Sequence, residues 1–525
     1  MARLSILTRI GNAAACLFGK HGDITAQAQQ ADCSRQTVYD HAVQVQAAVA
    51  QAQLPGPSRD ELLQENERLR AENQQLWDSL DSMVNFEEGR QQQFAASAAA
   101  LGLSLAQTVV LLTIVLGKAC CPSRAKLGRW VQASCGRAAP LLHLLDRACQ
   151  TLVRTLCLDE IFLRRQPVLL GVEPHSMTWV LGRRAPDRTG ETWAAALAPW
   201  PQLSYSLVDG GSGLRRGLKL LAQQRRAAPA TVSLESNLDN FHIQQDGQKA
   251  LRGEWQAAEV LWEKAEPADR VVIEKSRRQG QNACAASSTA RWAWQRAEKA
   301  FWQAEQRENA YRRVVAALEL FRADGMLNSR GAARADIVAA LKQLPGPRWA
   351  KFARMALDAR ALTFLDRLQR QLQEVQPRTE LRQALVQLWQ ARHPWWRKQF
   401  GGNLERNAAL VAVRRRVCQL LDPAWEASYE RVSKVLRETV RASSVVECMN
   451  SVVRMHQARH RGLSQALLDL KRLFWNCRTF AEGKRKKHCP YEHLGVRLPT
   501  YDWWELLQMD PDELQQKLSS TKLAA

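Results

Sequence analysis

The sequence predicts a multidomain α+β chain that is mostly α-helical, and three observations lead to this fold class. The chain has 525 residues, whereas a single domain usually takes about 100–200 residues. Apolar residues recur at helical spacing before residue 150 and again between residues 247 and 440. Between these regions, short apolar runs separated by turn residues begin near residue 153, a pattern that is typical of strands.

Composition narrows the range of functions. The chain has 74 Lys+Arg against 52 Asp+Glu and a net charge of +22, which favours a polyanionic partner, with nucleic acid foremost. The most apolar stretch, residues 109–116, is much shorter than the roughly 20 residues of a membrane span, so no membrane partner is expected. The twelve cysteines form no C-x-x-C pair. We therefore expect reduced thiols and a cytoplasmic protein, in the bacterial cytosol or associated with the nucleoid.

Residues 1–53 are expected to form a helix-turn-helix DNA-binding domain. The pattern predicts helices over Ile24–Ala31 and Arg35–Val45, with Ser34 as N-cap of the second. In such a domain the start of the second helix enters the major groove. The side chains expected to contact DNA are Arg35, Gln36, Thr37 and Tyr39. A helical hairpin without DNA contacts is the alternative.

Residues 58–90 predict a coiled coil that joins two or more copies of the chain. Leu62, Leu69, Leu76 and Met83 lie seven residues apart, and Asn66 is one of the residues at the alternate core position. Asparagine there specifies register and dimer formation. A solvated helix packed on its own chain is the alternative.

Residues 100–150 predict a second helix-turn-helix-like domain. Helices are expected over Ser104–Leu116, Ser123–Gln132 and Arg137–Thr151, with a turn at residues 134–136.

Residues 151–246 predict an α/β unit with five strands and a crossover helix over Glu191–Leu197. The expected strands are Val153–Leu163, Pro167–Glu173, Met177–Arg183, Leu203–Val208 and Thr231–Leu234.

Three acidic residues occupy positions suited to metal binding. Asp159 ends the first strand in Cys157-Leu158-Asp159, Asp209 ends the fourth, and Glu447 lies at the start of a later helix. Carboxylates at strand ends can converge at one edge of a sheet, and their oxygens suit Mg²⁺. Two such ions can assist an in-line phosphoryl displacement. The alternative for each aspartate is an ordinary turn-forming role.

Two further motifs accompany the acids. An Asp-x-x-His unit, Asp239 to His242, follows the fifth expected strand. On the helix that carries Glu447, Asn450 and Arg454 are three and seven residues further on, so all three share one face. Arg454 would bind a phosphate group.

With these motifs the sequence resembles the DDE transposases, whose catalytic core is RNase H-like. The resemblance covers about residues 150–480, and its most specific parts are the Asp-x-x-His unit and the block SSVVECMNSVVR at 443–454. The subgroup it resembles interrupts the core with a large helical insertion before the final Glu, and here 237 residues separate Asp209 from Glu447. The resemblance implies DNA cleavage and joining with two Mg²⁺ ions, for which Mn²⁺ can substitute, and recognition of transposon ends by the N-terminal domain.

The resemblance also divides the rest of the chain. It implies a first part of the RNase H-like core at 151–246, an all-α insertion at 247–440 and a final core segment at 441–490. The basic run at 484–487 and the acidic residues after it predict a C-terminal tail at 491–525. Asp159 is followed by Glu160, and either acid could be the first metal ligand. Alternation along a strand puts them on opposite faces, and we favour Asp159, which shares its face with Cys157.

A basic segment follows Glu447. Residues 454–488 hold ten Lys and Arg against two acidic residues, which predicts a DNA-facing surface. The side chains expected to contact DNA there are Arg459, Arg461, Lys471, Arg472 and Arg478.

The sequence thus predicts a Mg²⁺-dependent transposase that hydrolyses DNA at transposon ends and transfers the freed 3′-hydroxyl into target DNA. Asp159, Asp209 and Glu447 would be the catalytic metal ligands, supported by Asp239, His242, Asn450 and Arg454. Two alternatives stay open: a structure-selective nuclease or resolvase with the same core, and a domesticated, inactive DNA-binding regulator.

Overall fold

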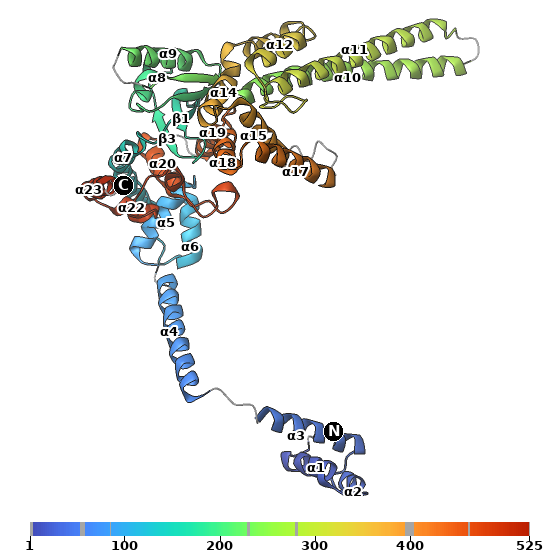
Figure 1. Cartoon of the computed structure of the whole chain (residues 1–525), viewed down its shortest axis with the longest axis vertical. Helices are drawn as coiled ribbons and strands as arrows, with labels where there is room; N and C mark the ends of the chain where they lie inside the picture. The colour runs from blue at the N-terminus through green and yellow to red at the C-terminus, as the bar shows by residue number, and fades with distance from the viewer. Residues whose placement is uncertain are drawn as a thin grey trace. The chain divides into compact units, whose positions relative to one another are not determined.

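The computed structural model of the chain describes residues 4–52, 58–84, 86–227, 232–278, 282–393, 404–459 and 463–523 (Figure 1). Residues Met1–Gly89 form one compact unit and Arg90–Ala525 form a second. Within the described ranges, none of the helices combines the length and the apolar character that crossing a membrane requires.

The N-terminal unit begins with three packed helices, α1 (Ile6–Phe18), α2 (Asp23–Gln30) and α3 (Arg35–Ala52). The two predicted helices and the short turn between them are present, and α3 extends further than expected. The Ser34 hydroxyl accepts a hydrogen bond from the Thr37 backbone N–H at 3.1 Å, as an N-cap should. The small core also contains a polar pair, in which the Asn12 side-chain amide lies 3.0 Å from His41 Nδ1.

Helix α4 (Arg59–Val84) covers the predicted coiled-coil segment. Its heptad leucines Leu62, Leu69 and Leu76 are 55%, 46% and 56% exposed. These three leucines are therefore not buried against the other described residues of the N-terminal unit.

The second unit begins with α5 (Glu88–Ala100), α6 (Leu105–Leu116) and α7 (Arg124–Cys149). The predicted turn at residues 134–136 is wrong, because α7 runs through it without a break. Ser134 and Cys135 are buried on the inner side of α7, so burial in the core keeps this segment helical despite Gly136. The predicted second helix-turn-helix trio is thus a pair of helices, of which the second is long.

A five-stranded mixed sheet forms the centre of this unit, in the order β3-β2-β1-β4-β5. The first three strands form an antiparallel meander, and β4 and β5 continue the sheet parallel to β1. The strands are β1 (Thr155–Leu163), β2 (Gln166–Val172), β3 (Trp179–Arg184), β4 (Tyr205–Val208) and β5 (Glu235–Leu238). The fifth strand was predicted at Thr231–Leu234, which is wrong: the strand starts at Glu235, where the backbone pairs with Tyr205.

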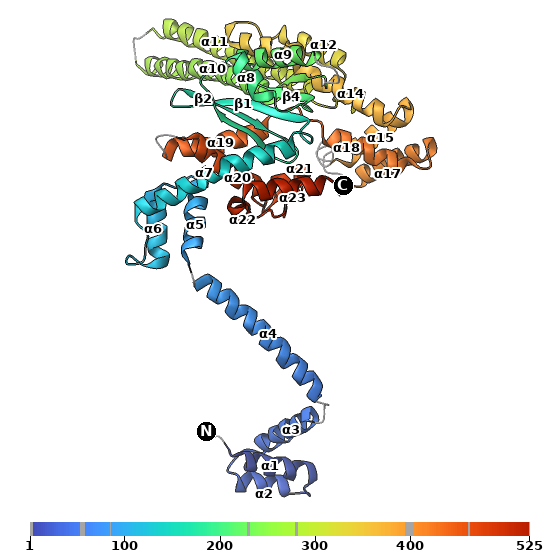
Figure 2. The ribbon, with the colours of Figure 1, turned by 90° about the vertical axis from the view of Figure 1, so that its left-hand side faces the viewer.

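Helices cover both faces of the sheet (Figure 2). Leu156 and Leu158 belong to the same core cluster as Trp193 of α8 (Gly190–Leu197) and Leu214 of α9 (Ser212–Arg226). Cys157, on the other face of β1, belongs to a cluster that includes side chains of α19 (Ser444–Arg459). The alternation of β1 thus directs Asp159, which shares the face of Cys157, toward α19.

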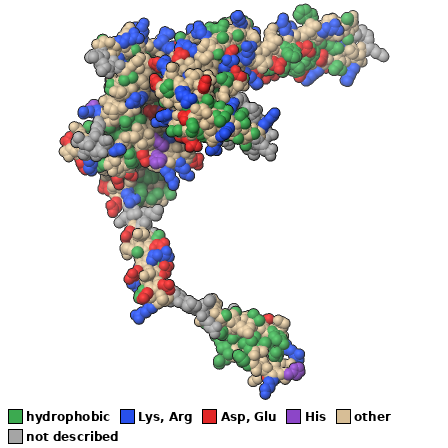
Figure 3. All heavy atoms as spheres, in the orientation of Figure 1, with side chains coloured by type: hydrophobic (Ala, Val, Ile, Leu, Met, Phe, Trp, Pro, Cys, Tyr) green, Lys and Arg blue, Asp and Glu red, His purple; other side chains and the backbone are tan. Residues whose placement is uncertain are grey.

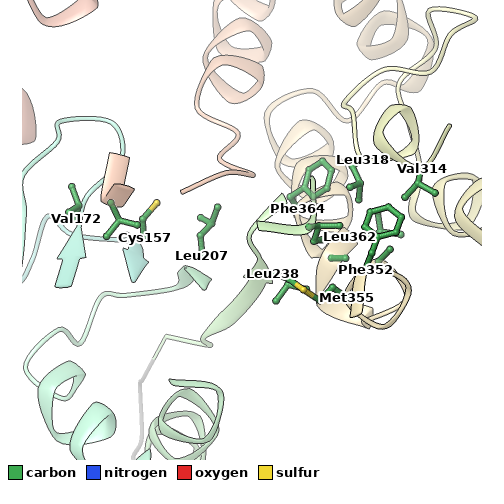
Figure 4. Packing of buried hydrophobic residues seen from close by; sticks show 14 of the residues in the cluster. Cys157, Val172, Leu207, Leu238, Val314, Leu318, Phe352, Met355, Leu362 and Phe364 are labelled. Atoms are coloured by element: carbon green, nitrogen blue, oxygen red, sulfur yellow. The ribbon is translucent and has the colours of Figure 1, made fainter. Parts of the chain in front are cut away.

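The long helical segment between β5 and α19 starts earlier than predicted, because α10 begins at Asn240 rather than near residue 247. Helices α10 and α11 form a long antiparallel hairpin (Figure 1), and the following helices pack against the edge of the sheet. Figure 4 shows Leu238 of β5 close to Met355 and Leu362 of this segment. The elements are α10 (Asn240–Arg277), α11 (Cys284–Ala317), α12 (Arg330–Leu341), η1 (Pro347–Trp349), α13 (Ala350–Ala356), η2 (Ala359–Leu362), α14 (Thr363–Val375), α15 (Thr379–Arg392), α17 (Leu404–Leu421) and α18 (Trp425–Arg437).

The predicted C-terminal tail is wrong, because residues 491–523 are folded. Tyr491, Leu506 and Leu514 are buried in the same core cluster as α7 and the sheet. The elements after α19 are α20 (Gln465–Cys477), η3 (Gly483–Arg485), α21 (Pro490–Leu494), α22 (Trp503–Gln508) and α23 (Pro511–Leu523).

Candidate active site

Three aspartates lie in register where the parallel pairing of β1, β4 and β5 ends. The prediction that Asp159 ends its strand is wrong, because β1 continues to Leu163 in its antiparallel pairing with β2. Leu158 of β1 pairs with Val208 of β4, and Val208 pairs with Leu238 of β5. Asp159, Asp209 and Asp239 are the residues that follow these three. Because neighbouring strands are only about 4.8 Å apart, the pairing places the three aspartates side by side.

Asp159 and Glu160 point to different neighbours. Asp159 is buried and accepts a hydrogen bond from the side-chain amide of Asn450 in α19 at 2.5 Å. Glu160 instead lies 3.3 Å from Arg188, in the segment before α8. The geometry therefore puts Asp159 on the side of Glu447 and Glu160 on the opposite side.

Asn450 links Asp159 to Glu447. The same Asn450 nitrogen lies 2.5 Å from Asp159 Oδ2 and 3.3 Å from Glu447 Oε2. Both carboxylates are therefore within hydrogen-bonding distance of a single atom. Asn450 is fully buried, and its own oxygen has no hydrogen-bond partner among the described residues. One turn of α19 thus brings together an acid from β1 and an acid that follows it by 288 residues in the sequence.

The Asp-x-x-His unit forms the other side of the site. Asp239 caps α10 by accepting a hydrogen bond from the Phe241 backbone N–H at 3.0 Å. Its carboxylate also accepts the Ser443 backbone N–H at 2.9 Å, the Ser443 hydroxyl, and His242 Nδ1 at 2.5 Å. His242 Nε2 lies 3.4 Å from Glu447 Oε1, so the ring connects Asp239 to Glu447.

The charges of the site act on one another. Burial raises the pKa of Asp159, and the negative charges of Asp209 and Glu447 add to this effect. The His242 hydrogen bond lowers the pKa of Glu447. Burial alone would lower the pKa of His242, but its hydrogen bonds to Asp239 and Glu447 raise that pKa to about 10. At neutral pH the site therefore contains an imidazolium among carboxylates.

The donor set fits Mg²⁺ in chemistry, since the carboxylate oxygens of Asp159, Asp209 and Glu447 are hard ligands. In the present arrangement, however, Asn450 and His242 engage the two oxygens of Glu447. Within the described part of the chain, no group of three or more His, Cys, Asp and Glu side chains is arranged to hold a metal ion.

A cavity of about 510 Å³ adjoins the site and shares Asp209 and His242 with it. The residues that line it belong mainly to the loop after β4, the first turns of α10, and the α13–η2 segment. The segment continues directly into α14, whose Phe364 backbone N–H donates to the Asn237 side chain of β5 at 3.0 Å.

The predicted DNA-contacting residues near the C-terminus divide into three groups. Lys471 and Arg472 are wrong as DNA contacts, because both are buried: Lys471 donates to the Ala100 carbonyl at 2.6 Å, and Arg472 pairs with Asp146. These side chains tie α20 to the neighbouring helices. Arg454 and Arg478 are exposed. Arg459 ends α19 and Arg461 lies outside the described residues.

The N-terminal residues proposed to read DNA lie at the start of α3 as expected. Arg35, Gln36 and Tyr39 are exposed, and Thr37 is half-buried. Gln36 is hydrogen-bonded to Asp40 at 2.9 Å, one turn further on.

The sequence reasoning missed Ser443 and the cationic residues of the cavity. Ser443 immediately precedes α19, where its contact with Asp239 is a tertiary one that no local pattern signals. Of the cavity residues, Arg215 follows the GGSG segment after Asp209, which is the one local sign that could have drawn attention to it.

Comparison of the chain with protein-family models, with curated proteins and with solved structures finds no match. The class of protein therefore has to be argued from the site itself.

Proposed function

We propose that the protein is a DDE-type DNA transposase with an RNase H-like core. The observation that carries the proposal is the meeting of Asp159, Asp209 and Glu447. The first two follow paired residues of adjacent parallel strands, and Asn450 joins Asp159 to Glu447 after a mostly helical insertion. This is the arrangement that the sequence resemblance implies.

In this proposal Asp159, Asp209 and Glu447 hold two Mg²⁺ ions, with Mn²⁺ able to replace them. Bound there, the ions would stabilise the charge that develops on the phosphodiester during hydrolysis and strand transfer. Asn450 positions Asp159 and Glu447, while Asp239 orients His242 toward Glu447. Arg454, exposed on the same helix, would bind a DNA phosphate.

DNA is the proposed substrate and partner, as transposon ends and as target. The net charge of +22 supports a polyanionic partner, and Figure 3 shows Lys and Arg side chains spread over the visible face of residues 90–525. The start of α3 would recognise the ends. We place the protein in the bacterial cytosol or nucleoid.

The exposed stripe of α4 supports a homodimer or higher oligomer. Pairing of two such helices would bury the heptad leucines that a single chain leaves in water.

The proposal is tested with DNA that carries the sequences flanking the reading frame. Wild-type protein with Mg²⁺ should cleave and join this DNA. Asp159→Asn, Asp209→Asn and Glu447→Gln should abolish both steps while DNA binding survives. Glu160→Gln is the matched control, since it removes a neighbouring acid on the opposite face and should leave most activity. Full activity in the three variants would refute the site.

The second candidate is an inactive DNA-binding regulator. The observation in its favour is the exposed start of α3, where Arg35, Gln36 and Tyr39 would contact DNA without any chemistry at the acidic site. Sequence-specific binding without metal-dependent cleavage would select this function. Cleavage of branched DNA without strand transfer would select a resolvase.

A further inference from the structure

Helix α1 presents an apolar face to solvent. All residues of α1 are described, and its exposed apolar side chains fall within roughly a third of the helix circumference, a sector that contains no polar or charged residue. These six residues, which we call the α1 face, are Ile6, Leu7, Ile10, Ala14, Leu17 and Phe18.

The other side of α1 builds the core of the N-terminal domain. Asn12 and Ala13 are buried there, and Asn12 contacts His41 of α3. None of the other described residues of the N-terminal unit buries the α1 face. Figure 3 shows hydrophobic side chains gathered on the visible surface of the N-terminal helices. A contiguous exposed apolar surface on so small a domain marks an interaction site.

The charge of the domain limits the kind of partner. Residues 4–52 contain three Lys or Arg and three Asp, whereas the whole chain has a net charge of +22. The α1 face has no side-chain group that could hydrogen-bond a phosphate or a base, so it does not suit DNA. Helices that bind a lipid surface are rich in Lys and Arg on their polar side, whereas the one cation of α1 is Arg9. The partner that fits is an uncharged apolar protein surface.

A second copy of the α1 face meets this requirement. In a two-fold dimer each face contacts its own equivalent, and an uncharged face on a neutral domain meets no like charge there. The chain itself also supplies the second copy, because α4, which is proposed to pair, begins at Arg59 shortly after α3 ends at Ala52. Pairing of α4 would hold two N-terminal domains at a high local concentration.

The size of the α1 face suits a contact that adds to the pairing of α4. Full burial of one large apolar side chain removes on the order of 100 Å² from water. With the exposed fractions of its five large side chains, the α1 face offers about 300–400 Å² per copy. A stable interface takes about 800 Å² per partner. The α1 face therefore supplies less than half of what a dimer needs, and α4 would supply the rest.

We propose that the α1 faces of two chains pack against each other, so that the two N-terminal domains of a dimer form one two-fold unit. The inference rests on the proposed pairing of α4 as the source of the second copy, and it needs neither metal ions nor DNA. Such a unit would hold the starts of the two α3 helices at one fixed distance, which sets the spacing of any two DNA sites that they contact together.

The test measures the dissociation constant of the dimer of the full chain by analytical ultracentrifugation. Leu7 and Phe18 are replaced together, because they are 81% and 86% exposed and their replacement spares the domain core. Leu7→Lys with Phe18→Lys should raise the dissociation constant at least about tenfold, since like charges then face each other. Leu7→Glu with Phe18→Glu should do the same.

An equimolar mixture of the Lys and Glu variants distinguishes a second copy from other partners. Opposite charges meet in the mixture whether the paired helices run parallel or antiparallel, because both ends of the α1 face carry a replacement. The mixture should therefore recover the wild-type dissociation constant to within about threefold. Loss of folding in the variants could not produce this recovery.

Gln29→Lys combined with Gln46→Lys is the matched control, because these exposed glutamines of α2 and α3 lie outside the α1 face. The control adds the same charge and should leave the dissociation constant within about twofold. An unchanged dissociation constant in both α1 variants, or a mixture that does not recover, would overturn the inference and leave the face to another partner. Failure of the proposed function is separate: it would appear as absent Mg²⁺-dependent cleavage, or as equal behaviour of Leu69→Lys and Leu63→Lys, with the effect of the α1 variants intact.

Discussion

Asp239→Asn is the most informative single change, because the Asp239 carboxylate is fully buried and accepts four hydrogen bonds. The amide keeps one oxygen for the Phe241 and Ser443 backbone N–H groups. Its nitrogen, however, replaces the oxygen that accepts from His242 and from the Ser443 hydroxyl. The substitution therefore removes one of the negative charges that keep His242 protonated, the other main one being that of Glu447.

The expected cost follows from these contacts. A hydrogen bond to a charged group contributes about 1.5–3 kcal/mol and a neutral one about 1 kcal/mol. Exchanging the charged bond to His242 for a neutral one and disturbing the Ser443 contact should destabilise the fold by about 2–4 kcal/mol. The pKa of His242 should fall from about 10 toward its ordinary value of 6.5.

The destabilisation caused by Asp239→Asn should depend on pH, and the direction of that dependence follows from the pKa of His242. The folded-state pKa of His242 is raised above its unfolded value, so its stabilising contribution is complete below pH 6.5 and is lost as the pH rises toward about 10. The difference between wild type and Asp239→Asn should therefore be largest at pH 6.5 or below. Near pH 10 it should fall to the roughly 1 kcal/mol of the disturbed Ser443 contact, which does not titrate.

Guanidinium denaturation at several pH values measures this difference, and NMR titration of the His242 ring, assigned with a His242→Gln variant, measures the pKa. Ser443→Ala is the matched control, since it removes one donor without removing the charge, and should cost about 1 kcal/mol with little pH dependence. A loss below about 1 kcal/mol at pH 6.5, together with an unchanged His242 pKa, would refute the reasoning.

Three further predictions concern other parts of the chain. Burial lowers the pKa of Lys471 to about 7, below its value in the unfolded chain. The free energy of unfolding should therefore rise between about pH 7 and 10.5, by at most about 1.4 kcal/mol per pH unit. Lys471→Met should remove this pH dependence in denaturation curves, and an unchanged pH dependence would contradict the prediction. Leu69→Lys should dissociate the dimer in analytical ultracentrifugation whereas Leu63→Lys, on the same helix outside the heptad stripe, should not; equal behaviour of the two variants would exclude the coiled coil. At a free Mg²⁺ concentration ten times the dissociation constant, the free energy of unfolding of wild type should increase by about 1.4 kcal/mol. Asp209→Asn should show no such increase in denaturation curves. An equal increase in both proteins would mean that the ion binds at another site.

Much of the fold could be predicted from local signals. The strand alternation of β1 gave the face of Asp159, and Ser34 gave the start of α3, because both depend on residues within a few positions. The turn in α7 and the C-terminal tail were mispredicted for the opposite reason. Tertiary burial of Ser134 and Leu514 overrides local glycine, polarity and charge there.

The site was predictable only in part. Asp209 stood out because it ends a strand, and Asp239 because it begins an Asp-x-x-His unit. Their alignment follows from backbone pairing that the sequence does not state. Lys471 and Arg472 were mispredicted because a count of charges cannot distinguish an exposed lysine from one that donates to a buried carbonyl. Arg215 and Arg354 of the cavity are 139 residues apart in the sequence, so no local pattern signals that they line the same space.

The contacts of Asp239 explain how a site can tolerate a large insertion between its acids. The insertion leaves the sheet at Asp239 and returns at Ser443, and the two residues are joined by two hydrogen bonds. One residue further, the Asn240 N–H donates to the Arg441 carbonyl at 3.1 Å. The first and last residues of the helical segment are therefore hydrogen-bonded to each other beside β5. Because α19 starts from this junction, the position of Glu447 depends on the junction rather than on the length of the helices between. This is why Asp239→Asn should disturb Glu447 as well as stability, although Asp239 is not among the proposed metal ligands.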